Sequence, residues 1–597
     1  MRKKESNIIL LSITLCWASS YIFIKDIPSS LSDFGYLTLT SGIAAIILLL
    51  VFFRRLRSLD RQTLIRSGIL SVLIAGNMLM EKVGLKYISS SQASFMASLN
   101  IVFVPLILFF FKKKPSKDNL LGIIIIIIGI LFSHGGFFTN GEMVYFEGTD
   151  IVGTLFMLGA CILMSIYTIV ATDFCKDSDP LILSVLQIAF SAIIGFILWV
   201  IEDPMTFAHV EWSDRMLSSI FILAIFSKAY AYIMLMYAER YADALSVTVI
   251  ASTEPIVTFA LALLIPNAEG HTESFSLGVA IGSVIIALGA FIAGSHFIER
   301  LFYKNNNFQS EEIYEEAEEK SNEQTCTVTE SAPIATSIMK ISKTTTRFRK
   351  NLSRFLLCFL PFTILGALFK VMTLVPGFTG VRPVNAIPTP AGLLYGPVGA
   401  VACALGNIAT DLFGTFDLKS ILGAISNFLA AYIPYRMWYA LYDKKPHTKT
   451  WTGILLYAWC SLLSSFVVSW FLVFGLELFF GIWMPQIYTM IFLNNFLFSI
   501  FLGLPLFILA RSDSINLHIR VPRPSRFKKI KRIPQKAVPF FFIISTVVFI
   551  GTQICVHYDL HLSNSIIASV LSIMGVAFLV CIFILPVKRR IKIGKEE

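Results

Sequence analysis

Charge is scarce in this chain. Only 15% of its 597 residues are Asp, Glu, Lys or Arg, whereas a soluble domain has roughly 25%. Apolar residues make up 56% of the sequence, and the mean hydropathy is +0.74. This composition predicts a polytopic membrane protein, and the length of the chain predicts at least two membrane units.

Clustered ligands for metals are also missing. The nine cysteines are scattered without a CxxC pair and the eight histidines form no cluster, which predicts neither a metal site nor a disulfide framework. No clear small-residue cleavage site follows the short polar start, Met1–Glu5, so the first apolar run is expected to be retained rather than removed as a signal peptide. We expect no metal and no bound cofactor.

The net charge of +11 is interpreted as a signal for membrane orientation, and no nucleic acid is expected as a partner. Lys and Arg gather in alternate short loops, such as Arg54–Arg66 and Lys112–Lys117, while the loop His134–Asp150 has three acids and no Lys or Arg. Because positive loops stay inside, we expect a multi-pass plasma membrane protein with both termini in the cytoplasm.

One stretch of the sequence occurs twice. Tyr87–Phe111 and Tyr241–Ile265 align at a constant offset of 154 residues, which sets Asn100 on Glu254. Each copy is an apolar run of roughly 20 residues, long enough to cross a membrane as a helix. The offset holds five such runs, an odd number, so the second copy enters the membrane from the opposite side. This pattern predicts an all-α, ten-helix inverted repeat of five plus five spans.

Three patterns in this region resemble the EamA-type drug/metabolite transporter superfamily over residues 8–297. They are WASSYIFIK (Trp17–Lys25), GLKYISSSQASFMASLNIVFVPL with Gly122 in the following span, and YADALSVTVIASTEPIV with Gly278. The resemblance implies that small metabolites cross by alternating access around a cavity between the two repeats, without a cofactor. Members often have a Glu shortly after the fourth span of each repeat, but the first copy here has Lys112–Lys114.

Two ionisable residues fall near the middle of expected spans, Glu254 and Lys228. Such a residue is costly unless it faces protein or water, so both are candidates for the substrate-binding site. Glu254 is interpreted either as a proton-coupled or cation-facing site or as an interhelical partner of Lys228. Pro255 interrupts the helix beside it, which suits a substrate-lining segment and also a simple kink.

The other candidate residues of this unit are Trp17, Asn77, Asn100 and Tyr232. Trp17 is interpreted as a wall on which a substrate stacks, with ordinary packing or an interfacial position as the alternative. For the other three, interhelical hydrogen bonds are the alternative to ligand contacts. Glu81 is a further polar position, just after a third span expected near Leu64–Met80.

From Glu299 to Arg354 the sequence becomes acidic and then basic, without an apolar run, which predicts a cytoplasmic linker. Later apolar runs predict a second helical membrane unit of about six to eight spans. The alternation of basic loops requires a break at Gly396–Pro397, which makes a short hairpin of about Val384 to Phe413. The expected domains are the two repeats (1–145 and 146–298), the linker (299–351), a membrane unit (352–511), a basic cytoplasmic loop (512–537), and two further spans with a basic tail (538–597).

A second resemblance lies in RPVNAIPTPAGLLYGPVGAVACALGNIATDLFG (Arg382–Gly414), followed by a Gly-Ala-Ile-Ser-Asn span. Over residues 352–511 it is similar to the substrate-capturing S-component of ECF vitamin transporters, which implies a broken hairpin near an outward pocket and an ATP-driven energy-coupling module as partner. The first span of this unit is rich in Phe and Leu and shows no clear docking motif for that module.

Five polar residues of the second unit are candidates for contact with a substrate, because amides offer donors and acceptors together. Interhelical hydrogen bonds are the alternative interpretation for the Asn and Asp residues. Arg382 belongs to the proposed outer loop, where it either meets an anionic group or is a solvated charge. The five are Arg382, Asn407, Asp411, Asn427 and Asn494.

The sequence as a whole predicts a membrane transporter of small metabolites, and not an enzyme, whose second unit binds substrate or modulates the first. Expected partners are a small-molecule substrate and the lipid bilayer. The alternatives are a membrane sensor or receptor with a transporter-like fold, and a carrier unit fused to a lipid-modifying membrane enzyme. No His-rich, paired-carboxylate or nucleophile pattern stands at the span ends of the second unit.

The orientation can be tested by tagging single introduced cysteines. A membrane-impermeant thiol reagent should label a cysteine placed between His134 and Asp150 in intact cells, because that loop is expected outside. A cysteine placed between Arg54 and Arg66 should react only after the cells are opened. The reverse labelling pattern would refute the orientation.

Overall fold

The computed structural model of the chain describes residues 3–28, 30–110, 117–134, 148–202, 205, 208, 210, 212–242, 244–264, 272, 277–295, 338–371, 382–413, 416–442, 444–511, 537–562 and 565–585. All regular structure in these residues is helical, and 13 of the described helices are long and apolar enough to cross a membrane. The prediction of an all-α polytopic membrane protein is confirmed. The loop Lys112–Lys114, the acidic part of the linker and the basic tail lie outside the described residues.

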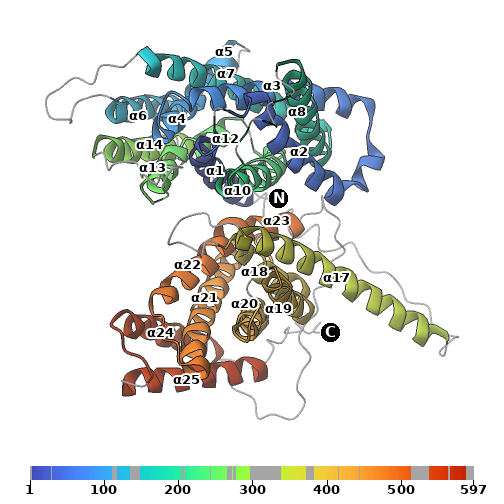
Figure 1. The fold of residues 1–597 in the computed structure, drawn as a ribbon, viewed down its shortest axis with the longest axis vertical. Coiled ribbons are helices and arrows are strands. Elements are labelled where there is room, and N and C mark those ends of the chain that lie inside the picture. Colours follow the sequence, from blue (N-terminus) through green and yellow to red (C-terminus); the bar gives the residue numbers. More distant parts are fainter. Residues whose placement is uncertain are drawn as a thin grey trace, which may run out of the picture. The chain divides into compact units, whose positions relative to one another are not determined.

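The chain forms two compact units, whose helices are drawn in Figure 1. One comprises Thr14–Val210 and Leu223–Arg349, and the other comprises Met1–Ile13, Glu211–Ile222 and Lys350–Glu597. Helix α17 (Ile338–Val371) begins inside the stretch expected to be linker. Its basic first part and the apolar run that follows form one continuous helix.

The helices of the first repeat are α1 (Lys3–Lys25), α2 (Asp33–Phe52), α3 (Arg61–Gly84), α4 (Ser90–Ala97), α5 (Asn100–Phe110) and α6 (Lys117–His134), with the short η1 (Arg55–Ser58) before α3. Those of the second are α7 (Gly148–Asp177), α8 (Pro180–Glu202), α10 (Asp214–Ile222), the π-helical η2 (Leu223–Tyr230), α11 (Ala231–Glu239), α12 (Ala244–Ala251), α13 (Glu254–Leu264) and α14 (Leu277–Ser295). Since α10, η2 and α11 follow one another without a gap, a described helix lies in each of the ten expected spans. Eight of these spans are long and apolar enough to cross a membrane within the described residues.

The fourth span of each repeat is broken at the same place. Helix α4 ends at Ala97 and α5 begins at Asn100, while α12 ends at Ala251 and α13 begins at Glu254, so the 154-residue offset holds on both sides of the break. Ser98 Oγ donates to the Phe95 carbonyl at 2.7 Å, and its repeat mate Ser252 Oγ donates to the Val249 carbonyl at 2.7 Å. Hydroxyls that bond back to the preceding turn bend and end helices.

Pro255 is the second residue of α13. A proline in the first turn of a helix displaces no backbone hydrogen bond, because the first N–H groups have no partner within the helix. The expected interruption at Pro255 therefore lies just ahead of it, between Ala251 and Glu254, and the proline starts the second half-helix.

Helices α6 and α14 lie side by side (Figure 1) and approach each other at glycines. A Cβ atom on Gly129 would lie 2.9 Å from the Gly282 carbonyl oxygen, and one on Gly289 would lie 2.8 Å from the Gly122 carbonyl oxygen. The contact is reciprocal, as expected for repeat-related helices. Gly129 corresponds in it to Gly289, and Gly122 corresponds to Gly282. Small residues permit this close backbone approach in membranes.

We call the helices of the two repeats the first membrane unit and the helices from α17 onward the second membrane unit. After α17 come η3 (Pro383–Ala386), α18 (Pro388–Tyr395), α19 (Pro397–Asp411), α20 (Lys419–Leu441), α21 (Trp451–Phe480), α22 (Gln486–Phe498), the π-helical η4 (Ser499–Gly503), α23 (Leu504–Arg511), α24 (Val538–His557) and α25 (Ile566–Ile584). The predicted break is confirmed, because Gly396 ends α18 with φ 60° and Pro397 begins α19. Glycine adopts this backbone conformation without the steric cost of a Cβ atom.

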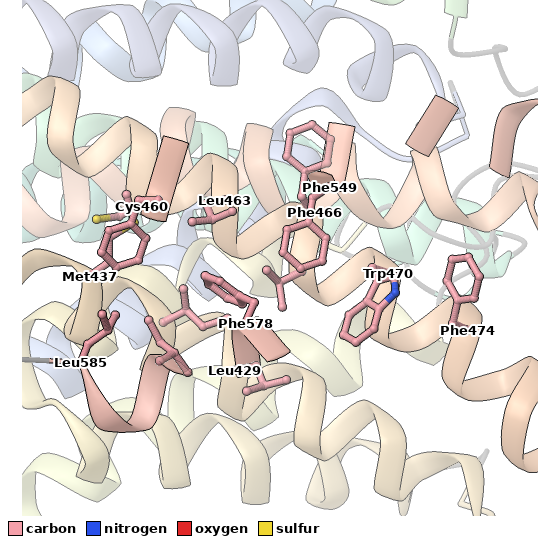
Figure 2. Packing of buried hydrophobic residues seen from close by; sticks show 14 of the residues in the cluster. Leu429, Met437, Cys460, Leu463, Phe466, Trp470, Phe474, Phe549, Phe578 and Leu585 are labelled. Carbon is pink, nitrogen blue, oxygen red and sulfur yellow. The ribbon is translucent and has the colours of Figure 1, made fainter. Parts of the chain in front are cut away.

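Aromatic and aliphatic side chains of α20, α21, α24 and α25 form one core, part of which is shown in Figure 2. The ring of Trp470 lies 5.7 Å from that of Phe549, and Phe549 lies 5.5 Å from Phe578. The last two helices are thus packed into the second membrane unit by the same core as α21.

Arg436 fixes the end of the last described helix. Its Nε donates to the Ile582 carbonyl at 3.0 Å, and its Nη2 donates to those of Phe583 and Leu585 at 3.2 and 2.6 Å. The last carbonyls of a helix have no partner within it and carry partial negative charge, so a buried guanidinium is well suited to them.

We predict that Arg436→Met destabilises the second membrane unit by roughly 1.5–3 kcal/mol, because the charge-assisted bonds are lost and the carbonyls stay buried. The thermal unfolding midpoint of the purified protein should fall, and trypsin should cleave the carboxyl-terminal tail faster. Arg349→Met, on an exposed position of α17, is the control and should change neither. An unchanged midpoint in Arg436→Met would contradict the assigned role.

Candidate functional site

A cavity in the first membrane unit is lined by both repeats, and we call it the inter-repeat cavity. Its free volume is about 50 Å³, which accommodates a few water molecules. Six of the seven residues expected in this unit line it, whereas Pro255 is not part of the lining. The six are Trp17, Asn77, Asn100, Lys228, Tyr232 and Glu254.

The repeat mates Asn100 and Glu254 both face this cavity, and each is the first residue of its half-helix. Asn100 Oδ1 accepts from Ser165 Oγ at 2.9 Å and from Cys161 Sγ at 3.1 Å. The Glu254 side chain is only 5% exposed and takes a hydrogen bond from Tyr21. Among the described residues, no group donates to Glu254 Oε1. The cavity therefore contains a buried acceptor with bonding capacity to spare.

Lys228 lies in the π-helical segment η2, and its ammonium group points to α2. Nζ donates to Thr40 Oγ1 at 2.6 Å and to Ser41 Oγ at 2.9 Å, and it lies 5.1 Å from the centroid of the Tyr36 ring. No ion pair joins Lys228 and Glu254 within the described part of the chain. The interhelical pair considered as an alternative for Glu254 is thus not formed.

Glu81 is a cavity residue that was not among the expected site residues. The apolar run ends near Met80, which predicts that Glu81 follows the third span, but α3 continues to Gly84 and so carries Glu81 into the lining. Asn77 Nδ2 donates to Glu81 Oε1 at 3.2 Å and to the Ala160 carbonyl of the second repeat at 3.1 Å. Asn77 and Glu81 are four residues apart, which places both side chains on one face of a helix. This spacing is the sequence signal from which Glu81 could be predicted as a site residue.

Aromatic rings form one wall of the cavity. The rings of Trp17 and Tyr232, which line it, lie 5.8 Å apart at 57°. Tyr167, which is not part of the lining, makes an edge-to-face contact with Tyr232 at 6.2 Å. Trp17 Nε1 donates to the Ser227 carbonyl at 3.3 Å, which connects the first helix of repeat 1 to the third span of repeat 2. The Trp17 ring is thereby oriented toward the cavity that it lines.

Polar contacts also join loops at the helix ends. At the end expected in the cytoplasm, Arg55 pairs with Asp179 at 2.7 Å, and Arg66 pairs with Asp177 at 3.4 Å. At the other end, Lys86 Nζ lies 2.6 Å from Asp33 Oδ2. The pairs at the cytoplasmic end link the two repeats, and the pair at the other end lies within the first.

The five candidate residues of the second membrane unit lie together in one hydrogen-bonded group, the amide cluster. Asn407 is at its centre, with Oδ1 accepting from Asn427 Nδ2 at 3.0 Å and from Arg382 Nη2 at 3.5 Å, and with Nδ2 donating to Asp411 Oδ2 at 3.2 Å. Asn494 Oδ1 accepts from the Arg382 backbone N–H at 3.2 Å. The bonds connect α19, α20 and α22 with the segment before η3, as the interhelical interpretation expects.

Three curated relatives are similar to this chain. An uncharacterized transporter of Clostridium kluyveri is 26% identical over 228 residues, which are 38% of this chain and 69% of the relative. An uncharacterized transporter of Archaeoglobus fulgidus is 22% identical over 270 residues, 44% of this chain and 80% of the relative. A probable 4-amino-4-deoxy-L-arabinose-phosphoundecaprenol flippase subunit of Hamiltonella defensa is 43% identical over 72 residues, 12% of this chain and 65% of that subunit.

A model of the EamA-like transporter family matches two stretches of the chain, residues 5–134 and 151–295. The match gives no support to the expected resemblance of residues 352–511 to an ECF S-component. The two matched stretches coincide with the repeats that build the inter-repeat cavity. Over residues 5–134 and 151–295, this membrane protein is similar to the EamA-like transporter family.

Proposed function

We propose that the first membrane unit carries a small metabolite across the plasma membrane by alternating access around the inter-repeat cavity. One observation carries the proposal: the repeat mates Asn100 and Glu254 start two half-helices and line the same cavity. Transporters built from inverted repeats place their substrate sites at the repeat interface, where broken helices supply free end groups.

The closed geometry fits one intermediate of such a cycle. The cavity holds about 50 Å³, enough for water but too little for a metabolite, so it must widen when a substrate enters. The ion pairs Arg55–Asp179 and Arg66–Asp177 join the repeats at the expected cytoplasmic end. In the proposed cycle these pairs separate when the cavity opens inward.

Glu254 is the proposed coupling residue. A buried carboxylate is tolerated when it holds a proton, pairs with a cation or faces water. Lys228 does not pair with Glu254, since Lys228 Nζ donates to Thr40 and Ser41. Glu254 is thus the side chain that binds a proton or a cation during transport.

For the second membrane unit we propose binding of a substrate or modulation of the first unit, with the amide cluster as the place where a polar ligand exchanges hydrogen bonds. On this proposal neither unit is an enzyme, and both termini lie in the cytoplasm. If the S-component resemblance holds, the partner of this unit is an ATP-driven energy-coupling module.

The similarity to a flippase subunit favours a second candidate, in which the first membrane unit moves a lipid-linked molecule. Proteoliposome assays distinguish the two, since a carrier of soluble metabolites accumulates a water-soluble probe and a flippase exposes a lipid headgroup on the opposite leaflet.

We predict that Glu254→Gln keeps the protein folded but abolishes transport or shifts its pH dependence, because the amide keeps the shape and loses the titratable group. The measurement is uptake or efflux in vesicles across a pH series, with the thermal stability of each variant recorded. Glu202→Gln makes the same change at an exposed position at the end of α8. It should transport normally, because the bond that Glu202 accepts from Ser32 Oγ can be accepted by the amide oxygen as well.

Glu254→Leu should also fold, because the bonds of Lys228 to α2 do not depend on Glu254. A large loss of stability in this variant would instead assign Glu254 a structural role. Transport by Glu254→Gln equal to that of the wild type at every pH would remove the residue from the mechanism.

A further prediction concerns the linker. Cutting the chain between Glu311 and Ser331 should leave two fragments that each extract as a folded membrane protein, because no apolar run lies in this stretch. If the second unit modulates the first, the amino-terminal fragment should still transport, at an altered rate. Aggregation of either fragment, while the uncut chain stays monodisperse, would refute the two-unit organisation.

A further inference from the structure

The ionisable groups of the inter-repeat cavity are unequal in number. Among its described lining residues two are acids, Glu81 and Glu254, and one is a base, Lys228. Lys228 uses two of its three N–H donors on Thr40 and Ser41, and it lies over the ring of Tyr36. The ammonium group of Lys228 therefore already has protein partners, whereas the two acids have fewer hydrogen-bond donors than their oxygens can accept.

The hydrogen-bonding groups of the cavity that still lack partners are acceptors. Glu81 Oε1 receives one donor, Asn77 Nδ2. Glu254 is 5% exposed, lines the cavity and has an oxygen, Oε1, to which no described group donates. A buried acceptor of this kind is satisfied by a ligand that brings N–H groups, and best by one that also brings positive charge.

The aromatic wall selects for the rest of such a ligand. Trp17 and Tyr232 pack at 5.8 Å, and the backbone bond of Trp17 Nε1 to Ser227 fixes the indole ring. Rings held in this way stack on planar ligands and attract cations by their electron-rich faces.

We propose that the inter-repeat cavity recognises a small organic ammonium compound that carries a planar apolar ring. The ammonium group donates to Glu254 Oε1, Glu81 contributes negative charge from α3, and the ring lies against Trp17 and Tyr232. The inference rests on the proposed transport function and specifies its substrate class. A carboxylate ligand fits poorly, because it meets two acids and a lysine already bonded to α2.

Three probes of similar size test the charge preference: phenethylamine, phenethyl alcohol and phenylacetate. Binding to the purified full-length protein in lipid nanodiscs is measured by calorimetry. Phenethylamine should bind about tenfold or more tightly than the alcohol, and phenylacetate should bind weakest. Equal or tighter binding of the alcohol or of phenylacetate, or no binding of any probe, would overturn the inference.

Substitutions of Glu254 and Glu81 test whether these acids cause the preference for the amine. Glu254→Gln should reduce the amine-to-alcohol affinity ratio about tenfold and leave alcohol binding unchanged, whereas Glu202→Gln should preserve the ratio. If Glu254→Gln does not fold, Glu81→Gln is measured in its place and should also lower the ratio. A ratio that survives substitution of the measured acid would refute the assignment.

Flux of the same probes separates this inference from the proposed function. Amine binding without flux in proteoliposomes would refute transport and leave the ligand class standing. Flux of phenylacetate in preference to the amine would support transport and refute the ligand class.

Discussion

A helix that stops inside a membrane leaves end groups that the hydrocarbon cannot satisfy, and this constraint organises the first membrane unit. Two helices of this chain stop at the same point of the repeat, after Ala97 and after Ala251. The hydroxyls of Ser98 and Ser252 bond back to carbonyls of the preceding turn. Irregular backbone at membrane depth is tolerated where protein or a cavity surrounds it, so the paired breaks and the inter-repeat cavity occur together.

The same constraint explains how the buried charges are arranged. An ammonium and two carboxylates in one apolar unit are tolerated because each has polar neighbours: Thr40 and Ser41 for Lys228, Asn77 for Glu81, and Tyr21 for Glu254. The π-helical segment η2 carries Lys228 toward α2 rather than toward Glu254. Local departures from α-helical winding of this kind are frequent at functional sites.

Sequence periodicity and offset predicted a large part of this architecture. The 154-residue repeat and the break at Gly396–Pro397 follow from apolar runs, charge alternation and glycine chemistry, all of which are visible in the sequence without knowledge of helix packing. The partner of Lys228 was not predictable in the same way, because depth in the membrane shows only that a charge needs a partner. Which helix supplies it depends on helix rotation, and packing between distant segments sets that rotation. Glu81 was not predicted as a site residue for a different reason. Helix α3 continues beyond the apolar run from which the span was predicted.

An inverted repeat whose two halves were identical would present the same groups to both sides of its centre. Here the scaffold is closely matched, as shown by the reciprocal glycine contacts of α6 and α14 and the equal half-helices around each break. The residues at the repeat-related positions differ, however, since Asn100 is an amide fully engaged through Oδ1 and Glu254 is a carboxylate with a free acceptor. The exchange of amide for carboxylate places a titratable group on the second repeat alone. A cation or proton taken up at the cavity therefore interacts more strongly with one repeat than with the other, and a ligand shifts an equilibrium between conformations only through such a difference.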